Sequence, residues 1–275
     1  MTILIAGAAV LAIVAGVAPW WGDPFPARSE PLAGTPVELR IQDGVTVREL
    51  HAIRAGVRLV HRFARRSLDW EVRGPVEARV AREDRCRGSA PSARELIGEG
   101  SGGFLCVDTA NVQWQVLIHT DPLAALAVSG HEYVHVLQAE LGCLPERDAQ
   151  EYRWIVEGMA THVAWRALAS SGLASDARVR RTIARDGAFD SHSEPLRHYE
   201  RAGGRTPQYA LWHAAMRSLL REAVANGAAP AARPETALRE FCERVGRGVP
   251  WRTAFARGFG LSPADFYARF EGPGP

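Results

Sequence analysis

The chain contains no lysine, and this absence limits what its glycines and basic residues can do. All 33 basic residues are arginines, and 31 acidic residues leave a net charge of only +2 over 275 residues. The glycine-rich run Gly98–Gly103 lacks the lysine of a phosphate-binding loop, so we expect a flexible turn there. The balanced charge argues against nucleic-acid binding. The basic run His61–Arg66 is expected on a solvated helix face.

The four cysteines include no Cys-x-x-Cys pair, which argues against a zinc ribbon or a thioredoxin-type redox site. Structural disulfides or buried free thiols remain. Cys86 and Cys106 bracket one short loop-rich segment, so we expect them to pair first, and Cys143 with Cys242 then follows by default. Four cysteines are compatible with an oxidising compartment.

The N-terminus lacks charge from Ile3 to Ala18. As a helix this run rises about 24 Å, and the tryptophans that follow suit a membrane interface, so we expect an anchor through residues 3–21. A cleaved signal peptide is the alternative, although no basic residue precedes the run and Pro19 follows it. A buried core helix is a third reading. Both the anchor and the signal peptide send the rest of the chain outside the cytoplasm.

The sequence predicts an α+β fold, with a small mixed sheet lobe followed by a mainly helical lobe. Residues 1–22 form the anchor or signal peptide, residues 23–44 read as an extended tether rich in proline and glycine, and residues 45–271 form the folded domain. Periodicity and cap residues predict helices over 46–67, 122–141, 148–171, 206–225, 234–245, 251–259 and 263–270, and strands over 76–80, 103–109 and 112–119.

The stretch from Ser129 to Gln138 (SGHEYVHVLQ) carries the most specific signal in the chain. On a helix, His131 and His135 lie one turn apart and can direct both imidazoles at one metal ion. Glu132 lies about 100° further round, where it can reach a water on the metal and act as a base. A catalytic zinc usually takes three protein ligands, so a third is expected elsewhere.

Glu157 is the best candidate for the third ligand. It lies in the otherwise apolar helical stretch Trp154–Arg166, where an unpaired buried charge is costly and metal ligation would stabilise it. The alternative is a glutamate on the solvated face of that helix.

These segments resemble the gluzincin zinc metallopeptidases. HEYVH is followed after 21 residues by EGMATHVA, and the tryptophan three residues before Glu157 is similar to the W-L-x-E-G-F-A segment of the aminopeptidase N type. The run Gly246–Glu271 resembles the tail of bacterial peptidase MA-like domains. The resemblance implies a zincin-like fold, with zinc held by His131, His135 and Glu157 at the junction of the two lobes and with Glu132 as general base.

Three further assignments accompany the resemblance. Tyr209 is similar in place to a helix-borne tyrosine that could donate to an oxyanion, although a core tyrosine is the alternative. Thr161 could orient a ligand, and strand 112–119 could pair with an extended peptide, although it could equally be an ordinary sheet strand. Possible substitutes for Tyr209 are His162, His192, His198 and His213.

The expected function is zinc-dependent hydrolysis of internal bonds in a protein or peptide substrate outside the cytoplasm. No G-x-M-E-N sequence is present, so the free N-terminus binding of the aminopeptidases is not implied. The rival hypothesis is an inactive metallopeptidase-like domain that acts as a binding or scaffolding module. A helical protein with a fortuitous motif is the third alternative.

Overall fold

The computed structural model describes residues 27–42, 44–81, 104–108, 121–144, 151–187, 194–200 and 208–272. Four predicted features lie outside these ranges: the N-terminal segment 1–22, the glycine-rich run 98–103, the strand 112–119 and His192. The predicted Cys86–Cys106 pairing lies outside them as well, because Cys86 is not among the described residues.

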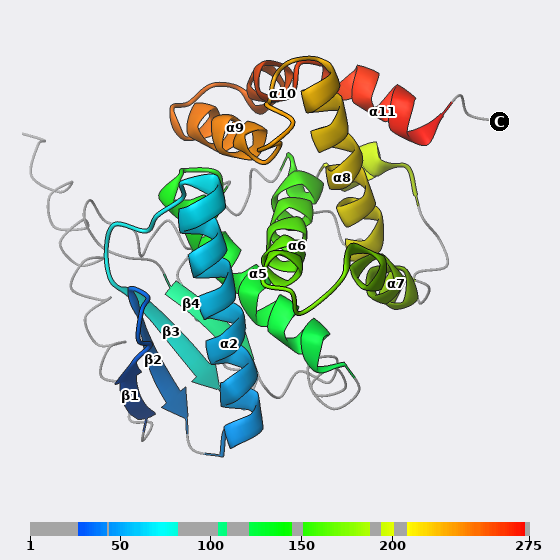
Figure 1. The fold of residues 1–275 in the computed structure, drawn as a ribbon. Coiled ribbons are helices and arrows are strands. Elements are labelled where there is room, and N and C mark those ends of the chain that lie inside the picture. Colours follow the sequence, from blue (N-terminus) through cyan, green and yellow to red (C-terminus); the bar gives the residue numbers. More distant parts are fainter. Residues whose placement is uncertain are drawn as a thin grey trace, which may run out of the picture.

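A four-stranded mixed sheet forms one side of the molecule (Figure 1). Its strands are β1 (Ala27–Pro31), β2 (Val37–Gln42), β3 (Val76–Ala81) and β4 (Phe104–Asp108), in that spatial order. β1 pairs antiparallel with β2, while β2, β3 and β4 run parallel. Strands β3 and β4 confirm the predictions over 76–80 and 103–109, and the mixture of sheet and helices confirms the α+β class.

The expectation of an extended tether over 23–44 was wrong for its described part. Strands β1 and β2 lie there, and Val37, Leu39 and Ile41 are buried in the main core. These residues alternate with the unburied Glu38 and Arg40, as a strand with one covered face requires. The strand was difficult to predict because a six-residue alternation is a weak signal in a stretch rich in proline and glycine. In addition, β2 is stabilised by pairing with β3, which is distant in sequence.

Helix α2 (Val47–Phe63) confirms the helix predicted over 46–67. It begins with a capping box in which the Thr46 side chain accepts from Glu49 N at 3.3 Å and the Glu49 carboxylate accepts from Thr46 N at 2.5 Å. It continues as a π-helical turn, Ala64–Leu68, and stops at Asp69, which has a left-handed conformation with φ of 55°. Because α2 connects β2 to β3, those two strands can run parallel.

The predicted histidine helix is α5 (Pro122–Glu140). The Asp121 side chain caps it by accepting from Ala124 N at 3.3 Å, and Pro122 occupies the first turn. The helix with Glu157 is α6 (Arg153–Ser170), which begins later than the predicted Asp148 and ends one residue before the predicted Ser171. Gly172, with φ of 77°, turns the chain after it.

The C-terminal part is helical, as predicted. Helices α8, α9, α10 and α11 match the four predicted ones within a few residues at each end, while α7 has no counterpart among the predicted elements. Their bounds, with the 3-10 turn η3, are α7 Asp176–Gly187, η3 Leu196–Tyr199, α8 Tyr209–Ala225, α9 Thr236–Gly246, α10 Trp251–Phe259 and α11 Pro263–Glu271.

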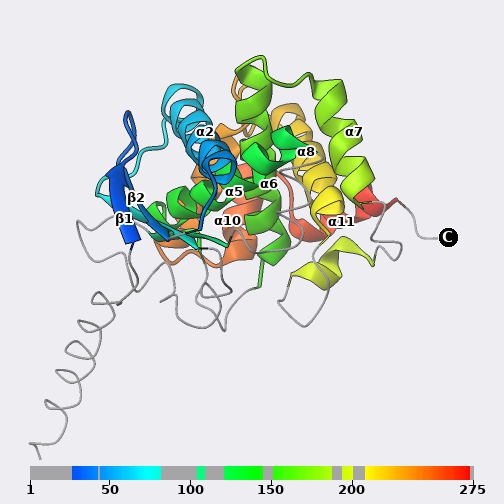
Figure 2. The same ribbon diagram turned by 90° about the horizontal axis from the view of Figure 1, so that it is seen from below.

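Helices α2, α5, α6 and α8 pack in series from the sheet side to the far side of the molecule (Figures 1 and 2). Helix α9 packs on α10 and is joined to the segment after α5 by a disulfide between Cys143 and Cys242, as expected from the sequence. In the part of the chain that the structure describes, no helix combines the length and apolar character needed to span a membrane.

Candidate metal centre

Helix α5 carries both histidines of the motif at a point where it is held on two sides. It packs against α2 on one side and α6 on the other, and only 9% of His131 is exposed. The rings of His131 and His135 lie edge to face with centroids 4.7 Å apart, because residues four apart project from neighbouring turns of one helix.

Glu157 on α6 meets both histidines. Its Oε2 lies 3.2 Å from His131 Nε2 and 3.6 Å from His135 Nε2, and the two Nε2 atoms are 3.0 Å apart. One nitrogen or oxygen from each of the three side chains lies within 4.8 Å of the others, so these residues could hold a metal ion. We refer to them as the His131–His135–Glu157 cluster. Their proximity removes the alternative of Glu157 on a solvated helix face.

In each of the two histidine rings, the Nδ1 atom lies on the side away from Glu157 and donates a hydrogen bond to a neighbouring side-chain oxygen. Thr161 Oγ1 donates to Glu157 O at 2.9 Å, which leaves it to accept from His131 Nδ1 at 3.2 Å. Gln138 Nε2 donates to Val156 O at 2.8 Å, so the Gln138 Oε1 accepts from His135 Nδ1 at 2.7 Å. With a proton on each Nδ1, both Nε2 atoms face Glu157. The Nε2–H of a protonated ring donates to this carboxylate, whereas the Nε2 lone pair of a neutral ring is open to a metal ion.

Of these two orienting residues, sequence reasoning named Thr161 and missed Gln138. The available signal was its spacing: Gln138 follows His135 by three residues, which puts the two side chains on the same side of the helix, and it interrupts an apolar run. Gln138 is fully buried.

The cluster favours positive charge. Burial acts against ionisation of Glu157, but hydrogen bonds from His131 and His135 outweigh it and hold the pKa of the carboxyl well below its usual value. Burial lowers the pKa of His135, and the hydrogen bond and charge of Glu157 outweigh that effect, raising the pKa to about 9. A carboxylate facing two imidazoles therefore stabilises a cation, either a proton or a metal ion.

Glu132 is half-buried and lies beside the cluster without joining it. Its charge contributes to the raised pKa of both His135 and Tyr209, so it is electrostatically close to both. Within the described residues its carboxylate makes no hydrogen bond or ion pair.

Tyr209 is the first residue of α8 and faces His131 edge to face, with ring centroids 5.7 Å apart. The residue as a whole is 43% exposed, so the alternative of a core tyrosine is wrong. Burial of the phenol, together with the charges of Glu157 and Glu132, raises its pKa. The hydroxyl therefore stays protonated and can donate a hydrogen bond at neutral pH.

Three of the histidines considered as substitutes for Tyr209 lie in the described ranges, and none of these three joins the cluster. His162 and His213 pack against each other with ring centroids 5.7 Å apart and line a separate pocket. His198 is exposed and lies with its Nδ1 3.0 Å from Glu194 Oε2.

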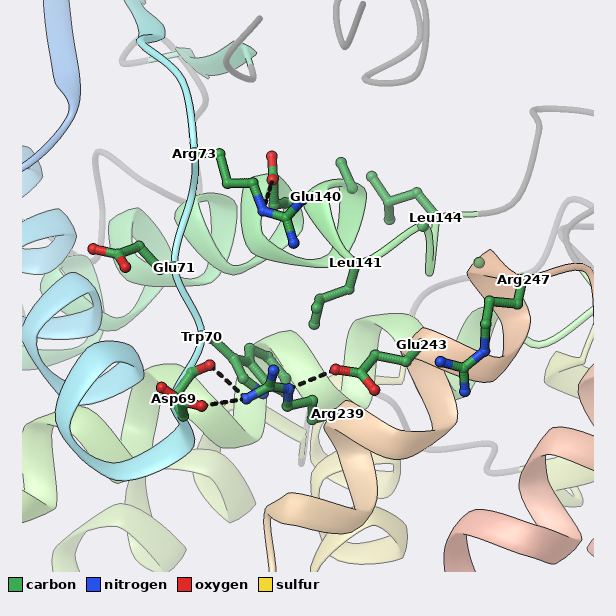
Figure 3. Close-up of a pocket in the computed structure, with 13 residues that line it drawn as sticks. Asp69, Trp70, Glu71, Arg73, Glu140, Leu141, Leu144, Arg239, Glu243 and Arg247 are labelled. Carbon is green, nitrogen blue, oxygen red and sulfur yellow. Dashed lines mark hydrogen bonds and ion pairs between the residues drawn. The ribbon is translucent and has the colours of Figure 1, made fainter. Parts of the chain in front are cut away.

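A cavity of about 780 Å³ lies at the C-terminal end of α5, away from the cluster (Figure 3). Five of its charged side chains are paired with one another: Arg239 binds both Asp69 and Glu243, and Arg73 lies 3.6 Å from Glu140. None of the predicted site residues lines it.

Comparison with known proteins adds no assignment: no protein-family model, no curated protein sequence and no solved structure matches this chain. A functional conclusion must therefore come from the chemistry of the cluster and its surroundings.

Proposed function

We propose that this protein is a zinc metallopeptidase of the gluzincin type that hydrolyses internal peptide bonds. The single observation that supports this is the His131–His135–Glu157 cluster, in which two imidazole nitrogens and a carboxylate oxygen converge. Three electron-pair donors this close together repel one another unless a cation lies between them. Two imidazoles and one carboxylate are a ligand set typical of catalytic zinc.

Each residue then has a distinct part. Zinc would supply a Lewis acid that polarises a carbonyl and acidifies a water molecule. Glu132, adjacent to a ligand and without a partner among the described residues, accepts the proton of the attacking water and passes it to the leaving amine. Tyr209 donates a hydrogen bond from its protonated phenol to the oxygen on which negative charge develops.

The substrate class and location belong to the same proposal. A protein or peptide substrate follows from the resemblance to metallopeptidases, as does the zincin-like assignment of the fold. An extracytoplasmic location rests on the uncharged run Ile3–Ala18.

The decisive variant is Glu132→Gln. We expect purified protein to carry about one zinc, and this variant to keep it, because no ligand changes. Peptide turnover should fall by about 10²-fold or more, since the amide cannot accept the proton. Zinc content by metal analysis and cleavage of a peptide library, with and without a chelator, provide the measurements.

Two variants complete the design. Glu157→Ala should lose zinc sharply, because three-ligand sites tolerate the loss of a ligand poorly. Glu140→Gln, on the same helix but paired with Arg73 outside the cluster, should keep both zinc and turnover.

Zinc-loaded Glu132→Gln that turns over like the parent would rule out this mechanism. A parent protein with zinc but no chelator-sensitive cleavage would instead favour the inactive binding module.

A further inference from the structure

A second pocket, of about 380 Å³, lies among α6, α7, α8 and the segment that leads into α9. Two helices line its walls with basic side chains, and within each helix these side chains follow one another at intervals of one turn. They are His162 and Arg166 on α6, and His213, Arg217 and Arg221 on α8. None of these residues belongs to the His131–His135–Glu157 cluster.

Both histidines are buried, and His162 lacks an adequate hydrogen-bond partner. Each is 5% exposed. Neither ring nitrogen of His162 makes a hydrogen bond within the described residues, and its Nε2 lies 3.5 Å from Glu235 Oε1, at the outer limit of such a bond. Buried polar groups in folded proteins are nearly always hydrogen-bonded, so an unsatisfied imidazole that lines a pocket indicates a missing partner.

The arginines leave positive charge uncompensated. Both carboxylates of the pocket approach the same arginine: Glu235 lies 3.2 Å and Asp176 3.9 Å from Arg166. Arg217 and Arg221 have no ion pair among the described residues. Burial and the nearby Arg180, Arg221 and Arg166 lower the pKa of Arg217 and together outweigh the opposing charge of Asp176.

We propose that this pocket binds a small ligand through an oxyanion group, a phosphate or a carboxylate, held by Arg217 and Arg221 at the rim and by the buried His162 and His213 within. Guanidinium groups match such oxygens in geometry and charge. Neutral imidazoles each supply one N–H donor, and burial lowers the pKa of His213 to about 3, so that ring is neutral at physiological pH. The volume suits a small molecule.

This pocket takes no part in the proposed peptidase activity. It is formed, however, by two helices that also carry residues of the proposed active site. Helix α6 carries both Glu157 and, five residues on, His162; helix α8 carries both Tyr209 and, one turn on, His213. A ligand that bridges α6 and α8 at the second pocket therefore contacts the two helices that hold Glu157 and Tyr209.

The test is calorimetric titration of the full chain, treated with a chelator, with inorganic phosphate and separately with malonate. Sodium chloride at matched ionic strength is the reference, and chelation removes binding at the metal cluster. We expect saturable binding of at least one probe with a Kd of about 1 mM or tighter. The probe that binds more tightly identifies phosphate or carboxylate as the preferred group.

Variants locate the binding. Arg217→Gln and the exposed Arg221→Gln should each weaken it by about tenfold or more. Asp176→Asn, which removes negative charge from the rim, should tighten it a few-fold. Arg257→Gln on α10, which removes an exposed arginine elsewhere, should change nothing.

Absence of saturable binding overturns the proposal, as does an equal response to chloride. Equal affinity in folded Arg217→Gln and Arg221→Gln also overturns it, with circular dichroism as the check on folding.

Discussion

Gln138 shows how one buried side chain can determine the chemistry of a neighbour. Its amide is oriented by donation to Val156 O on α6, and so its oxygen accepts from His135 Nδ1 and fixes the proton on that nitrogen. The ligand atom of His135 is therefore set by a contact between two helices. Thr161 has the same effect on His131 through Glu157 O.

We predict that Gln138→Leu lowers zinc affinity by about 10- to 100-fold, because His135 loses the acceptor that fixes its tautomer. Titration against a chelator of known affinity measures the change. Ser129→Ala is the matched control, since Ser129 is also buried on α5 but bonds only to Ala125 O. Unchanged affinity in folded Gln138→Leu would show that the tautomer is not set by this contact.

At the scale of elements, the position of α5 depends on glycines that bring backbones together. A Cβ on Gly56 of α2 would lie 2.3 Å from Leu126 O, and one on Gly130 of α5 would lie 2.6 Å from a Val60 methyl carbon. Gly130 immediately precedes His131. The histidine helix is therefore seated on α2 at a distance that no larger residue permits.

We predict that Gly56→Ala destabilises the protein by about 1–3 kcal/mol, because the clash is with backbone that cannot move aside. Chemical denaturation measures the difference. Gly258→Ala on α10 is the control: its nearest neighbour would lie at 3.3 Å, a tight contact without severe overlap, so the cost should be smaller than at Gly56. Equal stability of Gly56→Ala and the parent would mean that α2 and α5 can separate freely.

The elements differ in how far local sequence predicted them. Helix α5 was predicted closely because Asp121 and Pro122 define its start and apolar residues recur along it. Strands β1 and β2 were missed because a short alternation is stable only when paired with β3. Helix α7 was missed in a stretch rich in arginine, where few apolar residues mark a buried face.

At the scale of the whole molecule, buried histidines make stability depend on pH. The folded pKa of His213 is about 3, below its unfolded value of 6.5, because burial and the nearby His162 and Arg217 oppose its charged form. The unfolded state therefore takes up a proton first. The stability contributed by neutral His213 is fully present above pH 6.5 and is lost as the pH falls from 6.5 toward 3.

We predict that His213→Phe flattens the loss of stability between pH 6.5 and 4, where each unit of pH costs the parent about 1.4 kcal/mol from this group. Denaturant titrations at several pH values measure the slope. His198→Gln, which removes an exposed histidine, should leave the slope unchanged. A slope equal to the parent in His213→Phe would mean that the pKa of His213 is not lowered in the folded protein.

The disulfide between Cys143 and Cys242 belongs to this scale as well. It joins residues 99 positions apart and links the end of α5 to α9, so it restricts the unfolded chain over a long loop. The pairing was inferred from the sequence only by default, because the spacing of cysteines does not show which distant cysteines form a disulfide.

The sequence by itself determined the local features of the candidate site. Helical spacing brings His131 and His135 together because residues four apart share one face, and cap residues fixed where that helix begins. It also made Glu157 conspicuous, as a charge in an apolar helix. Only the tertiary structure decided that Glu157 meets both histidines, because that contact depends on how α6 packs against α5.

Packing alone also revealed the role of Gln138 and the pairing of His162 with His213. Each depends on a contact between two helices, Gln138 between α5 and α6 and the histidine pair between α6 and α8. Sequence periodicity shows which face of a helix is apolar. Which helix packs against that face depends on the close packing of the entire core.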